Sequence, residues 1–162
     1  AADFDPPHSP LAYVTQTTLS VDDTAEIIAA LKRRFPAIEG PRSADICYAT
    51  SNRQAAVKAV APGADLTIVV GSPTSSNSCR LVEVARKAGC PRAALIEDHQ
   101  AISVASLDDV NVLALTGGAS APELLIESVL QALARKFDLV VETIETARED
   151  IVFKPPVQLL AS

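Results

Sequence analysis

The chain has 162 residues, of which 48% are hydrophobic and 21% charged, a globular composition that excludes a disordered tail or a fibrous repeat. Its formal net charge is -6, and its aromatic residues are two Tyr and four Phe, which disfavours nucleic-acid binding. No apolar run approaches the roughly 18 residues of a membrane helix, and three cysteines favour a reducing compartment over a disulfide scaffold. We therefore expect a soluble, cytoplasmic protein.

Short β-branched runs alternate with amphipathic stretches along the chain, which is typical of βα units around a parallel sheet. The fold class is therefore predicted as α/β, with parallel-sheet lobes and flanking helices. The predicted strands are residues 12–15, 45–49, 66–70, 93–96, 112–115 and 139–142. The predicted helices are residues 21–34, 52–60, 77–87 and 122–136.

A break at residues 36–41 divides the chain into two unequal units. Residues 1–40 hold one strand and one helix and are interpreted as the end of a preceding α/β lobe, whereas residues 41–150 form a complete lobe of four or five strands. Residues 151–162 contain two consecutive prolines and are expected to form an extended arm. A lone βα pair leaves an apolar face uncovered, and the chain lacks methionine, so we expect further sequence before Ala1.

Four loops that precede helices are crowded with hydroxyl and amide side chains: residues 15–20, 47–54, 71–78 and 116–123. Ligands bind at the carboxyl ends of parallel strands, and helix N-termini bind anions, so we expect the ligand to be an anion. Helix capping is the alternative for any single loop, and Ser20 and Ser120 stand where capping boxes would place them. The four consecutive polar residues from Ser75 to Ser78 exceed what one cap needs. Neither the phosphate-loop nor the dinucleotide pattern is present.

Cys47 lies near the carboxyl end of a predicted strand, on the side of the expected anion site. The alternative is that it is a small buried hydrophobe, as most cysteines are. His8 and His99 have no spacing that would pair them with this thiol. Cys79 and Cys90 do not combine with it into a zinc or ferredoxin-type pattern.

Taken together, the loops resemble the carboxyl-terminal half of the LytB family, the 4-hydroxy-3-methylbut-2-enyl diphosphate reductases. The matching motifs are Thr15-Gln-Thr-Thr-Leu-Ser-Val-Asp-Asp23, Asp45-Ile-Cys-Tyr-Ala-Thr-Ser-Asn-Arg-Gln54, Val69-Val-Gly-Ser-Pro-Thr-Ser-Ser-Asn-Ser78 and Gly118-Ala-Ser-Ala-Pro-Glu123. The resemblance runs from Tyr13 to residues 151–153. It implies three α/β lobes around a [4Fe-4S] iron-sulfur cluster that is held by one cysteine from each lobe.

The resemblance also implies an activity, an oxidoreductase step in the methylerythritol phosphate route to isoprenoids. The substrate's allylic hydroxyl is removed with two electrons and two protons, giving isopentenyl and dimethylallyl diphosphates. An electron donor such as ferredoxin or flavodoxin serves the reaction, in the cytoplasm of a bacterium. In this half of the enzyme the implied iron ligand is Cys47. The implied diphosphate contacts are Ser75, Ser76, Asn77 and Ser120, and the implied catalytic residues are Thr17, near the substrate hydroxyl, and Thr18 behind it.

Some family features are altered or lie outside this sequence. Thr74 stands where the family usually has asparagine, and Gly117 where it usually has alanine. The other two cluster cysteines, three histidines and a proton-delivering glutamate belong to the family's amino-terminal half. We therefore expect the chain alone to lack a stable cluster and to be inactive. Two alternatives are a cluster-free module that binds a diphosphate or another small anion, and a proteolytic fragment with no independent role.

Overall fold

A continuous run of apolar and β-branched residues forms the central strand, β1 (Leu66–Val70), and all five of its residues are buried. It pairs in parallel with β2 (Ala93–Ile96) on one side and with β3 (Leu113–Gly117) on the other, so the strand order is β2-β1-β3. A parallel strand covered on both faces needs an apolar side chain at nearly every position, which explains the composition of β1.

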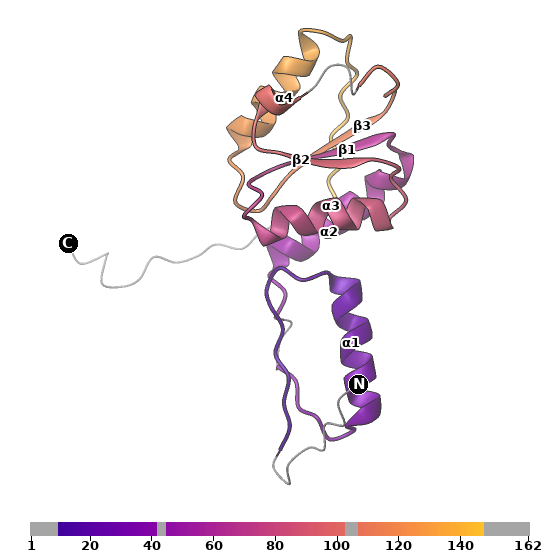
Figure 1. The fold of residues 1–162 in the computed structure, drawn as a ribbon, viewed down its shortest axis with the longest axis vertical. Coiled ribbons are helices and arrows are strands. Elements are labelled where there is room, and N and C mark those ends of the chain that lie inside the picture. Colours follow the sequence, from indigo (N-terminus) through magenta and orange to yellow (C-terminus); the bar gives the residue numbers. More distant parts are fainter. Residues whose placement is uncertain (1–9, 42–44, 103–106, 148–162) are drawn as a thin grey trace, which may run out of the picture.

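The structure, a computed structural model, describes residues 10–41, 45–102 and 107–147. Helices α2 (Tyr48–Val60) and α3 (Ser76–Lys87) lie side by side on one face of the sheet, and α4 (Glu123–Ala134) covers the other (Figure 1). The short 3-10 helices η1 (Ala61–Gly63) and η2 (His99–Ala101) follow α2 and β2. None of the helices in these ranges is both long and apolar enough to cross a membrane.

Alternate side chains of β1 contribute to two separate apolar clusters. Val69 packs with Val57 of α2 and Leu81 of α3. Ile68 belongs to the cluster on the opposite face, with Val129 of α4. Because successive side chains of a strand point to opposite faces, this single strand anchors the helices on both sides of the sheet.

Residues 10–41, the N-terminal arm, lie outside the sheet as helix α1 (Val21–Arg34) between two extended segments (Figure 1). The extended segments are joined by one parallel bridge, between Ala12 and Glu39. Thr24 is the buried residue of α1, whereas the side chain of Ile27 is 59% exposed. The arm therefore lacks, within the described residues, a partner for much of its helix.

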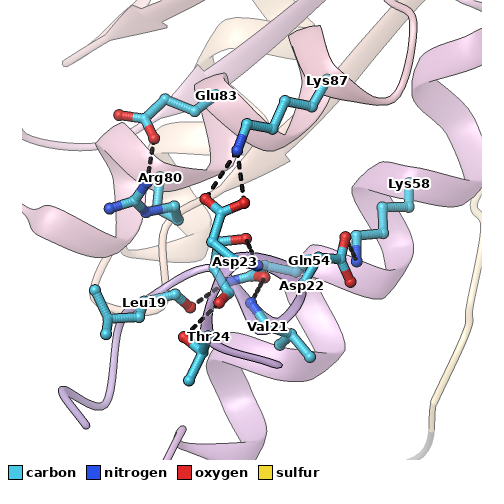
Figure 2. A network of polar contacts seen from close by, with 11 residues as sticks. Leu19, Val21, Asp22, Asp23, Thr24, Gln54, Lys58, Arg80, Glu83 and Lys87 are labelled. Carbon is cyan, nitrogen blue, oxygen red and sulfur yellow. Dashed lines mark hydrogen bonds and ion pairs between the residues drawn. The ribbon is translucent and has the colours of Figure 1, made fainter. Parts of the chain in front are cut away.

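A buried glutamine joins the arm to the sheet lobe (Figure 2). Gln54 of α2 is 1% exposed, and its Nε2 donates a hydrogen bond to the carbonyl oxygen of Leu19 at 2.8 Å. Its Oε1 accepts a hydrogen bond from the backbone N–H of Val21 at 3.0 Å. With both ends of the amide satisfied, Gln54 fixes the loop before α1 against α2.

Two ion pairs add to this junction (Figure 2). The Lys87 ammonium contacts both carboxylate oxygens of Asp23, at 2.7 and 2.8 Å, and Lys58 pairs with Asp22 at 2.6 Å. The Lys87 hydrogen bond lowers the pKa of Asp23, and the same contact raises the pKa of Lys87. Both groups face solvent, so these pairs orient the arm and contribute little to stability.

Several elements confirm the sequence predictions. The bounds of α1, β1 and β2 agree with the predicted ranges, and α3 and α4 differ from theirs by one or two residues at an end. The predicted helix 52–60 is the later part of α2. The third strand runs from Leu113 to Gly117 and not over residues 112–115, because Val112 is half exposed and its N–H is bonded to Asp65.

Three predicted strands are wrong. Residues 45–49 lead into α2, with Cys47 as its N-cap. Residues 139–142 have no ladder partner among the described residues, and Val140 is fully exposed. Residues 12–15 form no strand, and only Ala12 makes an isolated bridge, to Glu39. The described lobe therefore has three strands instead of four or five. The predicted arm at residues 151–162 lies outside the described residues.

Asp65 organises the start of β3. Its Oδ2 accepts hydrogen bonds from the N–H groups of Asn111 and Val112, each at 2.9 Å. The Val112 and Asn111 bonds lower the pKa of Asp65 below its ordinary value of 3.8. The unfolded carboxylate lacks these donors, so their contribution to stability is complete above pH 3.8 and is lost as the pH falls through the lower folded-state pKa.

We predict that Asp65→Asn lowers the free energy of unfolding at pH 7 and weakens its decline below pH about 4, because a neutral amide does not titrate there. Urea unfolding from pH 7 to pH 3 measures both effects. Asp108→Asn, which removes an exposed carboxylate in the same connection, is the control and should keep the wild-type acid dependence. An unchanged acid dependence in Asp65→Asn would contradict this account.

Candidate functional site

The loop after β1 ends in a capped helix N-terminus. Ser75 is the N-cap of α3, and its Oγ accepts a hydrogen bond from the backbone N–H of Ser78 at 3.3 Å. The N–H groups of Ser76 and Asn77 are first-turn donors with no acceptor within the helix. Free N–H groups and the positive end of the helix dipole together favour an anion.

Asn77, in this first turn, is a buried amide without a protein partner. The residue is 5% exposed, and neither its Nδ2 nor its Oδ1 has a hydrogen-bond partner among the described residues. An unpaired buried polar group costs about 1–3 kcal/mol, so folded proteins rarely keep one without a function. This amide is an observation independent of the helix terminus, and it indicates a ligand at the same place.

The side chain of Ser78 is enclosed between the ends of two strands. A Cβ placed on Gly71, directly after β1, would lie 2.3 Å from the Ser78 Oγ. A Cβ on Gly118, directly after β3, would lie 2.1 Å from the same atom. Only glycine at both positions lets α3 begin this close to the carboxyl edge of the sheet.

Ser120 is exposed in the turn after β3, two residues beyond the glycine that contacts Ser78. The N-cap of α4 is Pro122, and no side chain caps this helix. The capping interpretation of Ser120 is therefore wrong, and its hydroxyl is not used as a cap. At Ser20 the capping interpretation is confirmed, since its Oγ accepts a hydrogen bond from the Asp23 N–H at 3.2 Å.

The loop at Thr17 and Thr18 lies between Cys47 and the α3 N-terminus. The backbone N–H of Cys47 donates to the carbonyl oxygen of Thr17 at 3.2 Å. One residue on, the Oγ1 of Thr18 is 2.9 Å from the Oγ of Ser76. Two hydrogen bonds thus bring together residues from three of the four polar loops.

Cys47 is exposed at the N-terminus of α2, and its side chain makes no capping hydrogen bond. The interpretation of Cys47 as a small buried hydrophobe is therefore wrong. An accessible thiolate suits soft metals and iron-sulfur clusters, so Cys47 fits as one ligand. No group of three or more His, Cys, Asp and Glu residues within the described ranges could hold a metal.

The other two cysteines make internal contacts. Cys90 is buried, donates to the carbonyl oxygens of Arg92 and Ala64 at 3.0 and 3.4 Å, and accepts from Thr67 Oγ1 at 3.2 Å. Cys79 donates to the carbonyl oxygen of Pro73 at 3.3 Å. Cys90 thus forms internal hydrogen bonds within the apolar cluster of β1, α2 and α3.

The sequence reasoning missed three residues that shape the site: Ser78, Gly71 and Gly118. Each stands inside a motif that the sequence singled out, but the sequence assigned none of them a role. Their importance follows from distances across the sheet edge, between residues that are far apart in the chain. A glycine directly after each of two neighbouring parallel strands was the available signal.

Residues 2–134 match the profile of the family described as LytB protein. The chain belongs to the LytB family. Among curated relatives, a 4-hydroxy-3-methylbut-2-enyl diphosphate reductase of Ruegeria pomeroyi is 58% identical over 146 residues, which are 90% of this chain and 46% of the relative. The corresponding Hyphomonas neptunium protein is 54% identical over 92% of this chain and 47% of its own length. This LytB chain thus spans about half the length of the curated relatives it matches.

Solved structures agree with this assignment. The E-1-hydroxy-2-methyl-but-2-enyl-4-diphosphate reductase of Plasmodium falciparum matches with a TM-score of 0.90 and 39% identity, over 98% of this chain and 50% of that protein. A second solved structure, of an (E)-4-hydroxy-3-methyl-but-2-enyl diphosphate reductase, matches with a TM-score of 0.53 and 27% identity, over 79% of this chain and 44% of that protein. The predicted family and α/β fold class are confirmed.

We predict that Gly118→Ala destabilises the LytB chain by about 1–3 kcal/mol, because its Cβ would overlap the Ser78 hydroxyl. Ser78→Ala should relieve much of this loss, since the next contact is then 3.3 Å from the Ser78 Cβ. Thermal and urea unfolding of both single variants and the double variant measure the coupling. Gly63→Ala, whose Cβ would meet nothing within 4 Å, should change stability little. Additive effects of Gly118→Ala and Ser78→Ala would contradict the predicted overlap.

Proposed function

We propose that the chain is the carboxyl-terminal part of a 4-hydroxy-3-methylbut-2-enyl diphosphate reductase, in which it binds the substrate's diphosphate and supplies one iron ligand. The observation that carries this proposal is the buried, unpaired amide of Asn77 in a helix N-terminus that hydrogen bonds connect to Cys47. An anion site and an accessible thiol lie on one continuous set of loops, as such a reaction requires.

The diphosphate is held by neutral donors. Ser75, Ser76 and Asn77 lie at the start of α3, and Ser120 lies on the neighbouring loop after β3. Hydroxyls, one amide and first-turn N–H groups bind phosphoryl oxygens without a lysine, because the helix dipole and the N–H groups supply the positive potential. Asn77 gains the hydrogen bonds that it otherwise lacks.

The two threonines act beside the reacting carbon. Thr17 contacts the allylic hydroxyl, and Thr18 stands behind it, where its hydroxyl is hydrogen bonded to Ser76. The reaction consumes two electrons and two protons and releases the hydroxyl as water, leaving either of two isomeric diphosphates. When bound, a [4Fe-4S] cluster supplies the electrons and a Lewis-acid site, with Cys47 as one of its three cysteine ligands. A ferredoxin or flavodoxin serves as the electron donor.

The rest of the enzyme completes the site. In this proposal residues 1–40 end a preceding lobe, and residues 41–150 form a lobe of their own. The exposed apolar side chains of Val14 and Ile27 support a partner against the N-terminal arm. The other two cysteines come from the amino-terminal half, so the chain alone is inactive. The enzyme works in the bacterial cytoplasm.

A second candidate is a cluster-free module that binds a diphosphate. It is favoured by one observation, which is that Asn77 and the α3 N-terminus form an anion site entirely within this chain, whereas Cys47 is a single thiol. A fragment without an independent role would bind neither a diphosphate nor iron.

The test is to purify the chain together with the amino-terminal half of the Ruegeria pomeroyi relative and to reconstitute iron and sulfide anaerobically. We predict a visible iron-sulfur absorption and reductase activity for the pair, and neither for the chain alone. Cys47→Ser should abolish at least nine-tenths of both, because a thiolate ligand is lost. Cys79→Ser, the matched control, should retain them. If the Cys47→Ser chain, paired with the amino-terminal half, keeps the full iron-sulfur absorption, the assignment of Cys47 as an iron ligand is contradicted. If the wild-type chain and the amino-terminal half together show no such absorption but bind pyrophosphate, the cluster-free module is favoured.

A further inference from the structure

The hydroxyl of Ser78 makes a contact that the helix cap does not need. Ser78 is completely buried, and its Oγ donates a hydrogen bond to the Oγ of Ser75 at 3.0 Å. The backbone N–H of Ser78 donates to the same oxygen at 3.3 Å. We propose that Ser78 is a positioning residue that turns the Ser75 hydroxyl into an outward-facing donor for an anionic oxygen. This inference rests on the proposed diphosphate function.

A serine hydroxyl has two lone pairs, which can accept hydrogen bonds, and one hydrogen, which it can donate. Ser78 supplies donors to both lone pairs of Ser75, one from its side chain and one from its backbone. The remaining capacity of Ser75 is therefore to donate its own hydrogen. A phosphoryl oxygen can only accept a hydrogen bond, so a diphosphate requires Ser75 to act as the donor. A hydrogen bond to a charged acceptor is also stronger than one between neutral groups.

The enclosure of Ser78 keeps this arrangement fixed. Its Oγ lies against Gly71 at the end of β1 and against Gly118 at the end of β3. The hydroxyl has little room to rotate away from Ser75. The same contacts place the α3 N-terminus beside the loop that carries Ser120.

A purely structural role predicts a different outcome. The Ser75 cap uses only the backbone N–H of Ser78, which any residue but proline provides, and alanine is a better helix former than serine. Ser78→Ala should therefore preserve the cap and leave the unfolding temperature nearly unchanged. If the hydroxyl orients Ser75, the same variant should weaken anion binding, an effect that a cap alone would not produce.

The test is calorimetric titration of the 162-residue chain with inorganic pyrophosphate, with circular dichroism and thermal unfolding on each variant. We expect Ser78→Ala to bind about threefold to tenfold more weakly, the effect of one orienting hydrogen bond. Ser75→Ala should weaken binding at least as much, and Ser78→Ala should add little further loss in that background, because Ser78 acts through Ser75. Ser128→Ala removes a hydroxyl that bonds to Leu125 within α4 and should leave the affinity unchanged.

The outcomes separate this inference from the function on which it rests. A folded wild-type chain that does not bind pyrophosphate would overturn this inference, whereas the proposed function is tested separately by the reconstituted pair. Wild-type binding with an unchanged Ser78→Ala affinity would overturn only the role of Ser78. Fully additive losses from Ser75→Ala and Ser78→Ala would also overturn it, because the two hydroxyls would then act independently.

Discussion

The site depends on the buried, unpaired amide of Asn77. The apolar cluster that β1 forms with α2 and α3 fixes the position of α3 on the sheet, and the amide is buried with its helix although it has no protein partner among the described residues. The cost of about 1–3 kcal/mol is small beside the apolar burial, so the fold can retain the group. In the proposed site a bound anion recovers that free energy, so the feature that slightly destabilises the free protein contributes to the proposed affinity for a phosphoryl oxygen.

Helix α2 positions both the Cys47 thiol and the loop that carries Thr17 and Thr18. Helix α2 exposes Cys47 at its N-terminus, and two turns later its Gln54 fixes the loop that follows Thr17 and Thr18. Changes in the orientation of α2 therefore move the thiol and the threonines together. The ion pairs of Lys87 and Lys58 with the start of α1 add orientation at the surface, where solvent limits their energetic contribution. Hydrogen bonds thus bring loops that are distant in sequence together in one region of the molecule.

The sequence predicted those elements whose local pattern and tertiary environment agree. β1 is apolar throughout because both of its faces are buried, and Ser20 caps α1. The predicted strand at residues 45–49 failed because α2 already begins at Tyr48. The inward face of this helix includes two polar residues, Thr50 and Gln54, so a hydrophobicity pattern identified only its later part, residues 52–60. The motifs contain the polar loops that we propose bind an anion, but the enclosure of Ser78 between two glycines depends on distances across the sheet that no local pattern contains.

The most direct test of the central claim is the side-chain amide signal of Asn77 in the ¹⁵N-labelled chain, followed by NMR while inorganic pyrophosphate is added. If the unpaired amide is the core of the anion site, its two proton resonances shift and their exchange with solvent slows as the site fills. Assignment through Asn77→Asp, which removes this signal, identifies the resonances. Pyrophosphate binding that shifts other resonances and leaves the Asn77 amide unmoved would contradict the account.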